Sequence, residues 1–372
     1  MREKRILLSS PTMHGEEMSY IQEAFDTNWV APLGKNVDCF EQEICNYIGC
    51  GHAAALSSCT AAIHLALKLC GLKAGEPVLC SDLTFVATIN PVTYEGGRQV
   101  LIDSEYETWN MDPRALELAF RKYPQARIVI VADLYGTPAR LEEIRAICDR
   151  HRAILIEDAA EALSSTYRGR QAGTFGSYNA ISFNGNKIIT SSGGGMLLSE
   201  DASAVGKVRF WATQSKDPAP YYQHSEIGYN YRMSNIIAGI GRGQLLHLDE
   251  HRMLKKRIYE RYRAAFADLP LQMNPHTADA EPNYWLSCIL IDRACAVKPF
   301  DIMARLNEAN IDSRPIWKPM HMQPVFADCD YITLPNENVG EDIFARGLCL
   351  PSDIKMTQDE QDEVIRIVRS MF

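Results

Sequence analysis

Three short stretches of this chain place polar side chains where chemistry on a bound small molecule is possible. The first is the run Ser57, Ser58, Cys59 and Thr60, which stands between an apolar segment and a helical pattern. A helix N-terminus offers free N–H groups and partial positive charge, and hydroxyl side chains add hydrogen-bond donors. The run therefore suits a phosphate group, although the same residues also make an ordinary helix N-cap.

The second stretch ends an apolar segment with carboxylates. Residues 154–156 are apolar, and Glu157, Asp158 and Glu161 follow. Ligands of open α/β sheets bind at the carboxyl ends of strands, and a buried carboxylate there needs a cationic partner. The protonated ring nitrogen of pyridoxal phosphate would be such a partner, because protonation makes that ring an electron sink. A helix cap and a metal-binding carboxylate are the alternative interpretations.

The third stretch carries Lys187 in a segment rich in glycine and small polar residues. Asn184, Gly185 and Asn186 precede it, and residues 191–195 read Ser-Ser-Gly-Gly-Gly. Glycine lets a ligand approach the backbone closely, and a partly desolvated lysine is the amine that forms imines with carbonyl compounds. The alternative is a solvated lysine at the tip of an ordinary hairpin.

Alternating patterns between residues 51 and 200 indicate which elements position these stretches. Short apolar runs alternate with amphipathic segments, such as 60–69 and 141–152, which predicts an α/β fold with a mostly parallel sheet covered by helices on both faces. The last two strands are joined by residues 184–194 only, so a hairpin without a crossover helix makes the sheet mixed. The expected strands are 52–56, 77–80, 99–102, 127–132, 153–156, 178–183 and 195–198.

The chain outside this region gives fewer signals. The first forty residues are expected to be irregular, with a loop at 29–34. One long helical pattern covers 235–266, and Pro270 and Pro275 end it. Further on, 284–291 reads as a strand.

Chain length indicates how these elements divide. A chain of 372 residues is too long for one simple core. We expect a large domain of residues 1–248 and a smaller C-terminal α/β domain of residues 249–372, with helices at 300–309 and 358–370.

Composition excludes several classes of protein. The net charge of −9 argues against a nucleic-acid partner, which requires a basic surface. No apolar run is long enough to span a bilayer, and residues 6–8 are too few for the apolar part of an export signal. The 11 cysteines contain no Cys-x-x-Cys pair, which predicts no metal site and favours reduced thiols in the cytoplasm.

The three stretches follow one another in the order found in fold-type I pyridoxal phosphate enzymes. Together with other runs, they make the sequence resemble the DegT/DnrJ/EryC1/StrS sugar aminotransferases. The resemblance extends from Asn28 to Phe326. The matching runs are 58–67, 84–88, 158–162, Ser182 and Phe183 ahead of Lys187, and 228–233 (Gly-Tyr-Asn-Tyr-Arg-Met).

The resemblance implies a fold-type I aminotransferase with pyridoxal phosphate as its cofactor. Lys187 would be the catalytic residue, which bonds covalently to the cofactor and later moves a proton as general base and general acid. Asp158 would pair with the ring nitrogen, and Phe85 would stack on the ring. The other implied cofactor-binding residues are Ser58, Cys59, Thr60, Ala61, Ala160, Glu161 and Ser182.

Three positions carry further implications of the resemblance. An asparagine matching Asn230 reaches the phosphate from the neighbouring subunit in this family, so a homodimer with shared active sites is implied. Cys59 departs from the family, which commonly has glycine there. Glu161 stands where the family often has glutamine or histidine, and a glutamate beside the cofactor's phenolate needs a shared proton or a turn towards the substrate.

The resemblance also implies the substrates: a nucleotide-linked keto-sugar as acceptor and L-glutamate as amino donor, in the biosynthesis of a polysaccharide or glycan. Residues 183–190 and 193–196 are similar to the branch that makes UDP-bacillosamine-type sugars. This similarity predicts amination at C4 of UDP-2-acetamido-2,6-dideoxy-4-keto-hexose; a TDP- or GDP-linked sugar is the alternative.

Trp29, Lys318 and His321 are the candidate substrate-binding residues. For Trp29 the alternative is simple packing, and for the other two it is a loop that closes one domain over the other. Two rival classes of protein share the fold. A sugar dehydratase typically has histidine in place of Lys187, and a non-enzymatic regulator would not need Asp158, Lys187 and the phosphate hydroxyls together.

Overall fold

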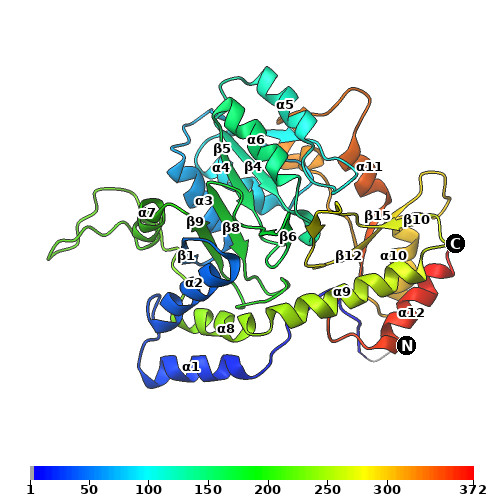
Figure 1. The fold of residues 1–372 in the computed structure, drawn as a ribbon, viewed down its shortest axis with the longest axis horizontal. Helices are drawn as coiled ribbons and strands as arrows, with labels where there is room; N and C mark the ends of the chain where they lie inside the picture. Colours follow the sequence, from blue (N-terminus) through cyan, green and yellow to red (C-terminus); the bar gives the residue numbers. More distant parts are fainter. Residues whose placement is uncertain (1–3) are drawn as a thin grey trace.

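An eight-stranded sheet forms the centre of the computed structural model, which describes residues 4–372 (Figure 1). Strand β9 is antiparallel to both of its neighbours, β1 and β8, and every other pair in this sheet is parallel. The expected mixed, mostly parallel sheet with one hairpin is therefore confirmed. Its strands are, in spatial order, β1 (His52–Leu56), β9 (Gly195–Ser199), β8 (Tyr178–Ser182), β5 (Ile154–Asp158), β4 (Ile128–Ala132), β2 (Pro77–Ser81), β3 (Arg98–Ile102) and β14 (Asp330–Ile332).

The position of β9 determines the direction of the other strands. Because two antiparallel pairings follow one another, β1 runs parallel to β8. The carboxyl ends of β1, β8, β5, β4 and β2 therefore lie at one edge of the sheet, where α/β proteins bind their ligands.

Strand β4 illustrates how the sheet is covered on both faces. Ile128 and Ile130 pack into a core with residues of α3, whereas Val129 and Val131 pack into another core with residues of α5 and α6. This alternation follows from the two-residue period of a strand. The helices between the strands are α3 (Cys59–Leu69), α4 (Asn90–Tyr94), α5 (Pro113–Lys122), α6 (Leu141–His151) and α7 (Ala202–Ala212).

The N-terminal forty residues are not irregular, so that prediction is wrong. They form α1 (Glu16–Asp26) and the start of α2 (Lys35–Ile48), separated by the expected loop at 29–34. Both helices have a glycine as N-cap, Gly15 or Gly34, and no side chain caps them. The usual start signal of a helix, a Ser, Thr, Asp or Asn side chain, is therefore missing from the sequence.

The long helix expected at 235–266 is two helices, α8 (Asn235–Leu245) and α9 (Leu248–Ala265). The chain bends at Leu246 and His247, and α9 runs on towards the C-terminal part of the molecule (Figure 1). The hydrophobic pattern continues through the bend, because both helices bury one face, and so the pattern alone does not locate it.

The C-terminal part contains a second, antiparallel sheet with its own core. The strand expected at 284–291 begins at Ser287. β14 leaves this part and pairs with β3 of the large sheet, and the domain boundary near residue 248 stays a prediction. The second sheet is β10 (Leu271–Met273), β12 (Ser287–Ile291), β15 (Gly347–Leu350) and β13 (Arg314–Pro315), with helices α10 (Pro299–Glu308), α11 (Val339–Arg346) and α12 (Gln358–Arg369) nearby.

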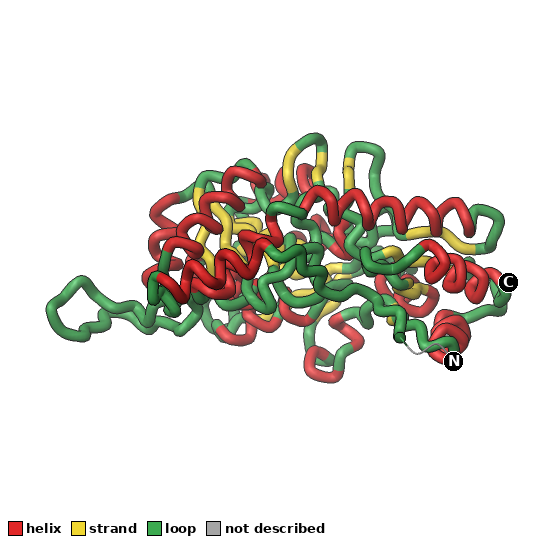
Figure 2. Tube along the Cα trace, turned by 90° about the horizontal axis from the view of Figure 1, so that it is seen from below, coloured by secondary structure: helices red, strands yellow, loops and turns green. Residues whose placement is uncertain are grey.

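Two further features complete the fold. A small sheet joins β11 (Ala280–Glu281), β6 (Thr166–Tyr167) and β7 (Arg170–Gln171). The protruding segment, residues 213–230, follows α7 and extends beyond the body of the molecule in two perpendicular views (Figures 1 and 2). Among residues 4–372, no helix is long and apolar enough to cross a lipid bilayer.

Candidate active site

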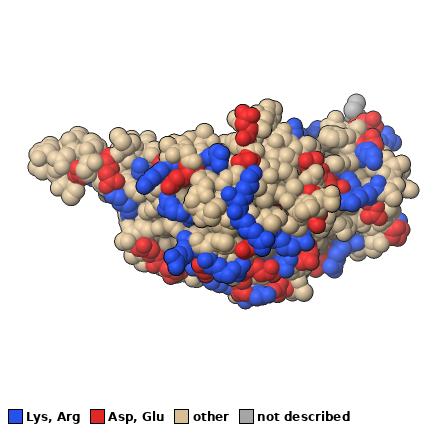
Figure 3. Space-filling view, turned by 90° about the horizontal axis from the view of Figure 1, so that it is seen from above, with Lys and Arg blue, Asp and Glu red and all other residues tan. Residues whose placement is uncertain are grey.

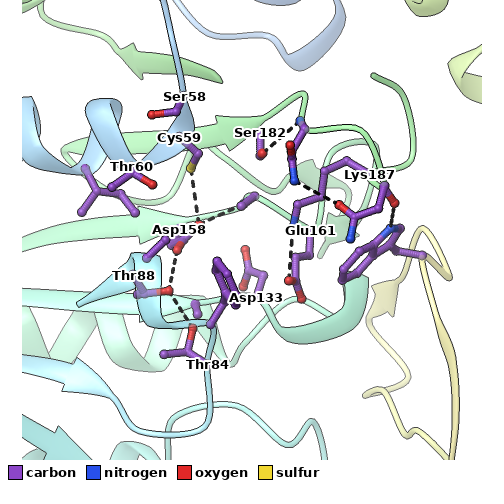
Figure 4. Close-up of a pocket in the computed structure, with 18 of the residues that line it drawn as sticks. Ser58, Cys59, Thr60, Thr84, Thr88, Asp133, Asp158, Glu161, Ser182 and Lys187 are labelled. Atoms are coloured by element: carbon purple, nitrogen blue, oxygen red, sulfur yellow. Dashed lines mark hydrogen bonds and ion pairs between the residues drawn. The ribbon is translucent and has the colours of Figure 1, made fainter. Parts of the chain in front are cut away.

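A cavity of about 350 Å³ opens at the carboxyl edge of the large sheet, within the size range of small-molecule sites. It brings together residues that lie more than a hundred positions apart in sequence. Figure 4 shows Ser58 and Thr60 on one side, Lys187 on the other, and Asp158 and Glu161 between them. The predicted site residues that line it are Ser58, Cys59, Thr60, Phe85, Asp158, Ala160, Glu161, Ser182 and Lys187.

The start of α3 forms the hydroxyl-rich side of this cavity. Ser58 is the N-cap of α3, and its Oγ accepts the N–H of Ala61 at 3.1 Å. Strand β9 passes very close to this turn: a Cβ on Gly195 would lie 2.2 Å from the backbone nitrogen of Cys59. Glycine at 195 is thus required for the β1–α3 turn to sit against β9, which places the Ser58 and Thr60 hydroxyls near that of Ser182.

Asp158 ends β5 in the middle of the cavity, and its direct partners are all uncharged. The hydroxyl of Thr88 donates to Oδ2 at 2.7 Å, the N–H of Ala160 donates to Oδ1 at 3.1 Å, and the Cys59 thiol lies 3.8 Å from Oδ1. Burial raises the pKa of Asp158, and the hydrogen bonds from Thr88 and Ala160 and the charge of Lys187 only partly oppose this shift. A cationic ligand atom would compensate this buried carboxylate.

Lys187 lies on the opposite side, in the turn that joins β8 to β9. Its Nζ donates to Glu161 Oε1 at 3.2 Å, and Glu161 Oε2 accepts the backbone N–H of Tyr135 at 2.7 Å. Burial raises the pKa of Glu161, and the charge of Asp158 adds to the shift, whereas Lys187 and the Tyr135 N–H oppose it. The site thus holds two carboxyl groups close to one ammonium group.

Aromatic rings form the remaining walls. Phe85 leaves 53% of its surface exposed although it lines the cavity, so one face of its ring is free to stack on a planar ligand. Trp317 packs on Phe85 with ring centres 5.3 Å apart, and its backbone N–H donates to the Tyr135 hydroxyl at 3.0 Å. The Trp285 ring centre lies 4.3 Å from Lys187 Nζ.

Sequence reasoning gave no role in the site to Thr88, Trp285 and Trp317, which also line this cavity. The Thr88 hydroxyl donates to Asp158 and also hydrogen bonds to the Thr84 hydroxyl at 2.7 Å. Both threonines belong to the family-like run 84–88, and their spacing of four residues was the signal that could have linked them. Trp285 and Trp317 come from the C-terminal part of the chain. No sequence spacing connects these tryptophans to Lys187, because only the tertiary fold brings them there.

Five predicted site residues do not line the cavity, and their roles stay predictions. The Ala61 N–H is taken by Ser58. Trp29 is half exposed, and its backbone carbonyl accepts a hydrogen bond from Asn235 Nδ2 at 3.0 Å. Lys318 follows the cavity-lining Trp317 and is partly exposed. The two remaining residues are Asn230 and His321.

Asn230 and His321 have other neighbours. Asn230 is exposed and forms a β-bridge with Thr213 at the base of the protruding segment. His321 lies between two carboxylates, with Nδ1 2.7 Å from Asp82 Oδ2 and Nε2 3.0 Å from Glu341 Oε1. Burial lowers the pKa of His321, but the hydrogen bonds and charges of Asp82 and Glu341 outweigh it and raise the pKa above its ordinary value.

These observations test whether pyridoxal phosphate fits the cavity. Among residues 4–372, no cation is in direct contact with the Asp158 carboxylate, which suits a protonated ring nitrogen. The α3 N-terminus offers hydroxyl groups and the positive end of a helix dipole to a phosphate. Phe85 presents a free aromatic face, and Lys187 presents an amine. The residues present therefore fit the ring, the phosphate and the aldehyde of this cofactor.

Comparisons with known proteins agree with this geometry. The sequence profile of the DegT/DnrJ/EryC1/StrS aminotransferase family matches residues 11–369, and the chain belongs to this family. EpsN of Bacillus subtilis, an assigned pyridoxal phosphate-dependent aminotransferase, is 48% identical over 99% of this chain and 96% of its own. GDP-perosamine synthase of Caulobacter vibrioides is 34% identical over 97% of this chain and 96% of its own. A family member of known structure from Brucella abortus has a TM-score of 0.88 at 26% identity, over 95% of each chain.

The class of the protein follows from the family. The chain is a pyridoxal phosphate-dependent sugar aminotransferase, whose substrates are a keto-sugar and an amino donor. The cofactor, the enzyme class and the fold expected from the sequence are thereby confirmed.

Proposed function

We propose that this enzyme transfers the amino group of L-glutamate to C4 of UDP-2-acetamido-2,6-dideoxy-4-keto-hexose. The observation that carries the proposed chemistry is the convergence of Lys187, Asp158 and the hydroxyls of Ser58, Thr60 and Ser182 around one cavity. Each group matches one part of the cofactor, and the space between them accommodates the reacting carbon of a substrate.

The residues divide the chemistry between them. Pyridoxal phosphate, when bound, supplies an electron sink that stabilises negative charge on the substrate carbon. The Asp158 carboxylate, held by Thr88 and Ala160, keeps the ring nitrogen protonated. Lys187 Nζ would hold the cofactor and, with its amine free, would carry a proton between the substrate carbon and the cofactor, as general base and then as general acid. Glu161 Oε1 lies within hydrogen-bond distance of Nζ and orients the amine for both steps.

The sugar is assigned from sequence similarity. Residues 183–190 and 193–196 are similar to the branch that makes UDP-bacillosamine-type sugars, which supports a UDP-linked 4-keto-sugar. The relationship to GDP-perosamine synthases, at 31–34% identity, favours a GDP-linked 4-keto-sugar as the second candidate. Single-turnover rates with UDP-, GDP- and TDP-linked 4-keto-6-deoxyhexoses decide between them. Slowest turnover of the UDP-sugar would overturn the assignment.

We further propose a homodimer in which Asn230 of one subunit reaches the phosphate of the other. The protruding segment supports this arrangement, because Tyr221, Tyr222 and Ile227 expose 65%, 82% and 76% of their surface. Residues 218–225 carry no Lys, Arg, Asp or Glu, and the tip of the segment shows no charged atoms in Figure 3. Exposed apolar surface of this kind marks protein contacts.

Two broader predictions remain part of this proposal. A cytoplasmic location is supported by the cysteines, all of which are free thiols. A division into residues 1–248 and 249–372 is supported by the second sheet and its separate core.

Absorption spectroscopy tests the proposed roles of Lys187 and L-glutamate. We expect the purified wild type to show a visible cofactor band that L-glutamate abolishes, and Lys187→Ala to lack both the band and its response. Lys73→Ala, at an exposed lysine outside the cavity, is the matched control and should behave as wild type. A response to L-glutamate that survives in Lys187→Ala would refute the role given to this residue.

A further inference from the structure

Three histidines gather where the N-terminal segment meets the bend between α8 and α9. His14 precedes α1, His247 lies in the bend, and His251 lies in the first turns of α9. The rings of His14 and His247 are stacked with centres 3.6 Å apart, and His14 Nε2 lies 2.8 Å from His251 Nε2. Glu250 Oε2 lies 3.3 Å from His247 Nδ1. None of these residues lines the active-site cavity.

Hydrogen bonding determines which nitrogen of His14 is free. His251 Nδ1 lies 2.8 Å from the carbonyl oxygen of Ile188, which only accepts, so Nδ1–H is the donor. In a neutral His251, Nε2 is then bare and accepts the Nε2–H of His14. A neutral His14 consequently has a bare Nδ1, and within residues 4–372 this atom has no hydrogen-bond partner. The arrangement therefore leaves His14 Nδ1 as an available metal ligand.

His247 faces a carboxylate on each of its ring nitrogens. Nε2 lies 3.3 Å from Glu16 Oε2, and Nδ1 lies 3.3 Å from Glu250 Oε2. Carboxylates only accept hydrogen bonds, and a neutral imidazole carries one proton. One ring nitrogen therefore points a lone pair at a carboxylate lone pair, which is unfavourable unless a cation lies between them. A carboxylate that orients the far side of a histidine ring, as Glu16 does here, is typical of metal ligands.

We propose that His14, His247 and Glu250 bind one divalent transition-metal ion of the zinc type. Their ligand atoms all lie within 4.8 Å of one another, and a zinc ion with bonds of about 2.0 Å would draw them to about 3.3 Å. The two imidazole rings must turn out of their stack to direct both Nδ1 atoms at one ion. Glu250 is exposed, so water completes the tetrahedral shell.

The proposed ion joins two segments that are connected by hydrogen bonds to the residue after Lys187. It connects the segment before α1 to the first turn of α9. His14 is hydrogen bonded to His251, and His251 is hydrogen bonded to the carbonyl of Ile188. These bonds extend the connection to Ile188, the residue after Lys187. The ion therefore acts on the stability of the segment that carries Lys187, and it takes no part in the chemistry of the cavity.

Metal binding to the intact, cofactor-loaded enzyme tests the proposal. After dialysis against a chelator, Zn²⁺ titrated in a calorimeter should bind at one ion per chain, and Co²⁺ should give the visible bands of a tetrahedral site. His14→Ala, His247→Ala and Glu250→Gln should each weaken Zn²⁺ affinity by at least about 100-fold, and Glu16→Gln by about 10- to 100-fold. His276→Ala, at a histidine outside this group, is the matched control and should bind as wild type.

The rival explanation is a proton in place of the metal ion between His247 and Glu250. In that case wild type binds no Zn²⁺ at one ion per chain, and the proposal is overturned. Binding that is equal in wild type and Glu250→Gln would overturn it as well, and this exposed substitution keeps the fold intact. The visible cofactor band of each variant shows separately that the active site is assembled, so these outcomes do not depend on the proposed sugar substrate.

Discussion

Lys187 and Glu161 form an ion pair inside the active-site cavity, with 3.2 Å between Nζ and Oε1. Only 11% of the lysine side chain and 7% of the glutamate side chain are exposed. Removing one partner of such a pair leaves an uncompensated buried charge. The charge of Lys187 therefore opposes the rise in the pKa of Glu161 that burial causes.

Glu161→Gln should flatten the pH dependence of stability in the cofactor-free protein. Burial raises the pKa of Glu161 in the folded state above its ordinary 4.5. The stabilisation from this group is therefore fully present below pH 4.5 and is lost as the pH rises through the folded pKa. Urea titrations at several pH values from 4.5 to 8 should show a steeper decline of unfolding free energy for wild type than for the variant. Parallel declines would contradict this expectation.

Thr88→Val should weaken binding of pyridoxal phosphate. The variant removes the 2.7 Å hydrogen bond to Asp158 Oδ2, and a hydrogen bond to a charged group contributes about 1.5–3 kcal/mol. The dissociation constant, measured by absorption titration of cofactor-free protein, should rise about 10- to 150-fold. Thr27→Val is the control, since the Thr27 hydroxyl donates to the Glu23 carbonyl of α1, outside the cavity. Equal affinity in wild type and Thr88→Val would show that the hydrogen bond from Thr88 to Asp158 does not contribute to cofactor binding.

Trp285 should affect turnover through Lys187, because its indole N–H donates to the Asn186 carbonyl at 2.7 Å and its ring contacts Nζ. Trp285→Phe keeps an aromatic face but loses the hydrogen bond, and Trp285→Leu loses both. At about 1 kcal/mol for each contact, kcat should fall about 5-fold in the first variant and about 30-fold in the second. The KM of the keto-sugar should stay unchanged.

Trp109→Phe is the control for general effects of losing an indole. The Trp109 N–H is buried and has no hydrogen-bond partner within the described part of the chain, so its removal breaks no such contact. A rise in KM without a change in kcat for Trp285→Leu would place this tryptophan in substrate binding instead.

His321 should make stability decline as the pH rises above 6.5. Asp82 and Glu341 raise the pKa of His321 above its ordinary 6.5 in the folded state. The stabilisation is fully present below pH 6.5 and is lost as the pH rises through the folded pKa, at about 1.4 kcal/mol for each pH unit between the two pKa values. Denaturant titrations of wild type and His321→Gln should converge at high pH. His52→Gln, at an exposed histidine, should follow wild type throughout.

The sequence was sufficient for the parts of the site that depend on local pattern. Asp158 and Ser182 end apolar strands, and Ser58 caps a helix, so periodicity and capping preferences locate all three. The glycine-rich segment around Lys187 similarly predicted the hairpin that the structure contains.

The missed parts depend on contacts between distant segments. α1 and α2 were not predicted because their glycine N-caps give no start signal. Trp285 reaches Lys187 from the C-terminal part of the chain. His321 lies in a run similar to the family, but its ring nitrogens contact Asp82 and Glu341. No spacing in the sequence predicts either contact.

The place of β9 between β1 and β8 also sets an order of events during synthesis. The ribosome adds about 5–20 residues per second, and β1 leaves it well before Gly195–Ser199, the strand with which it pairs. Until β9 has been synthesised, β1 and the turn at Ser58 cannot join the large sheet, because β1 pairs with it through β9. A nascent chain that ends before residue 195 therefore exposes the apolar strand 52–56 as a target for chaperones, and the hydroxyl-rich side of the cavity assembles only after the Lys187 turn has been made.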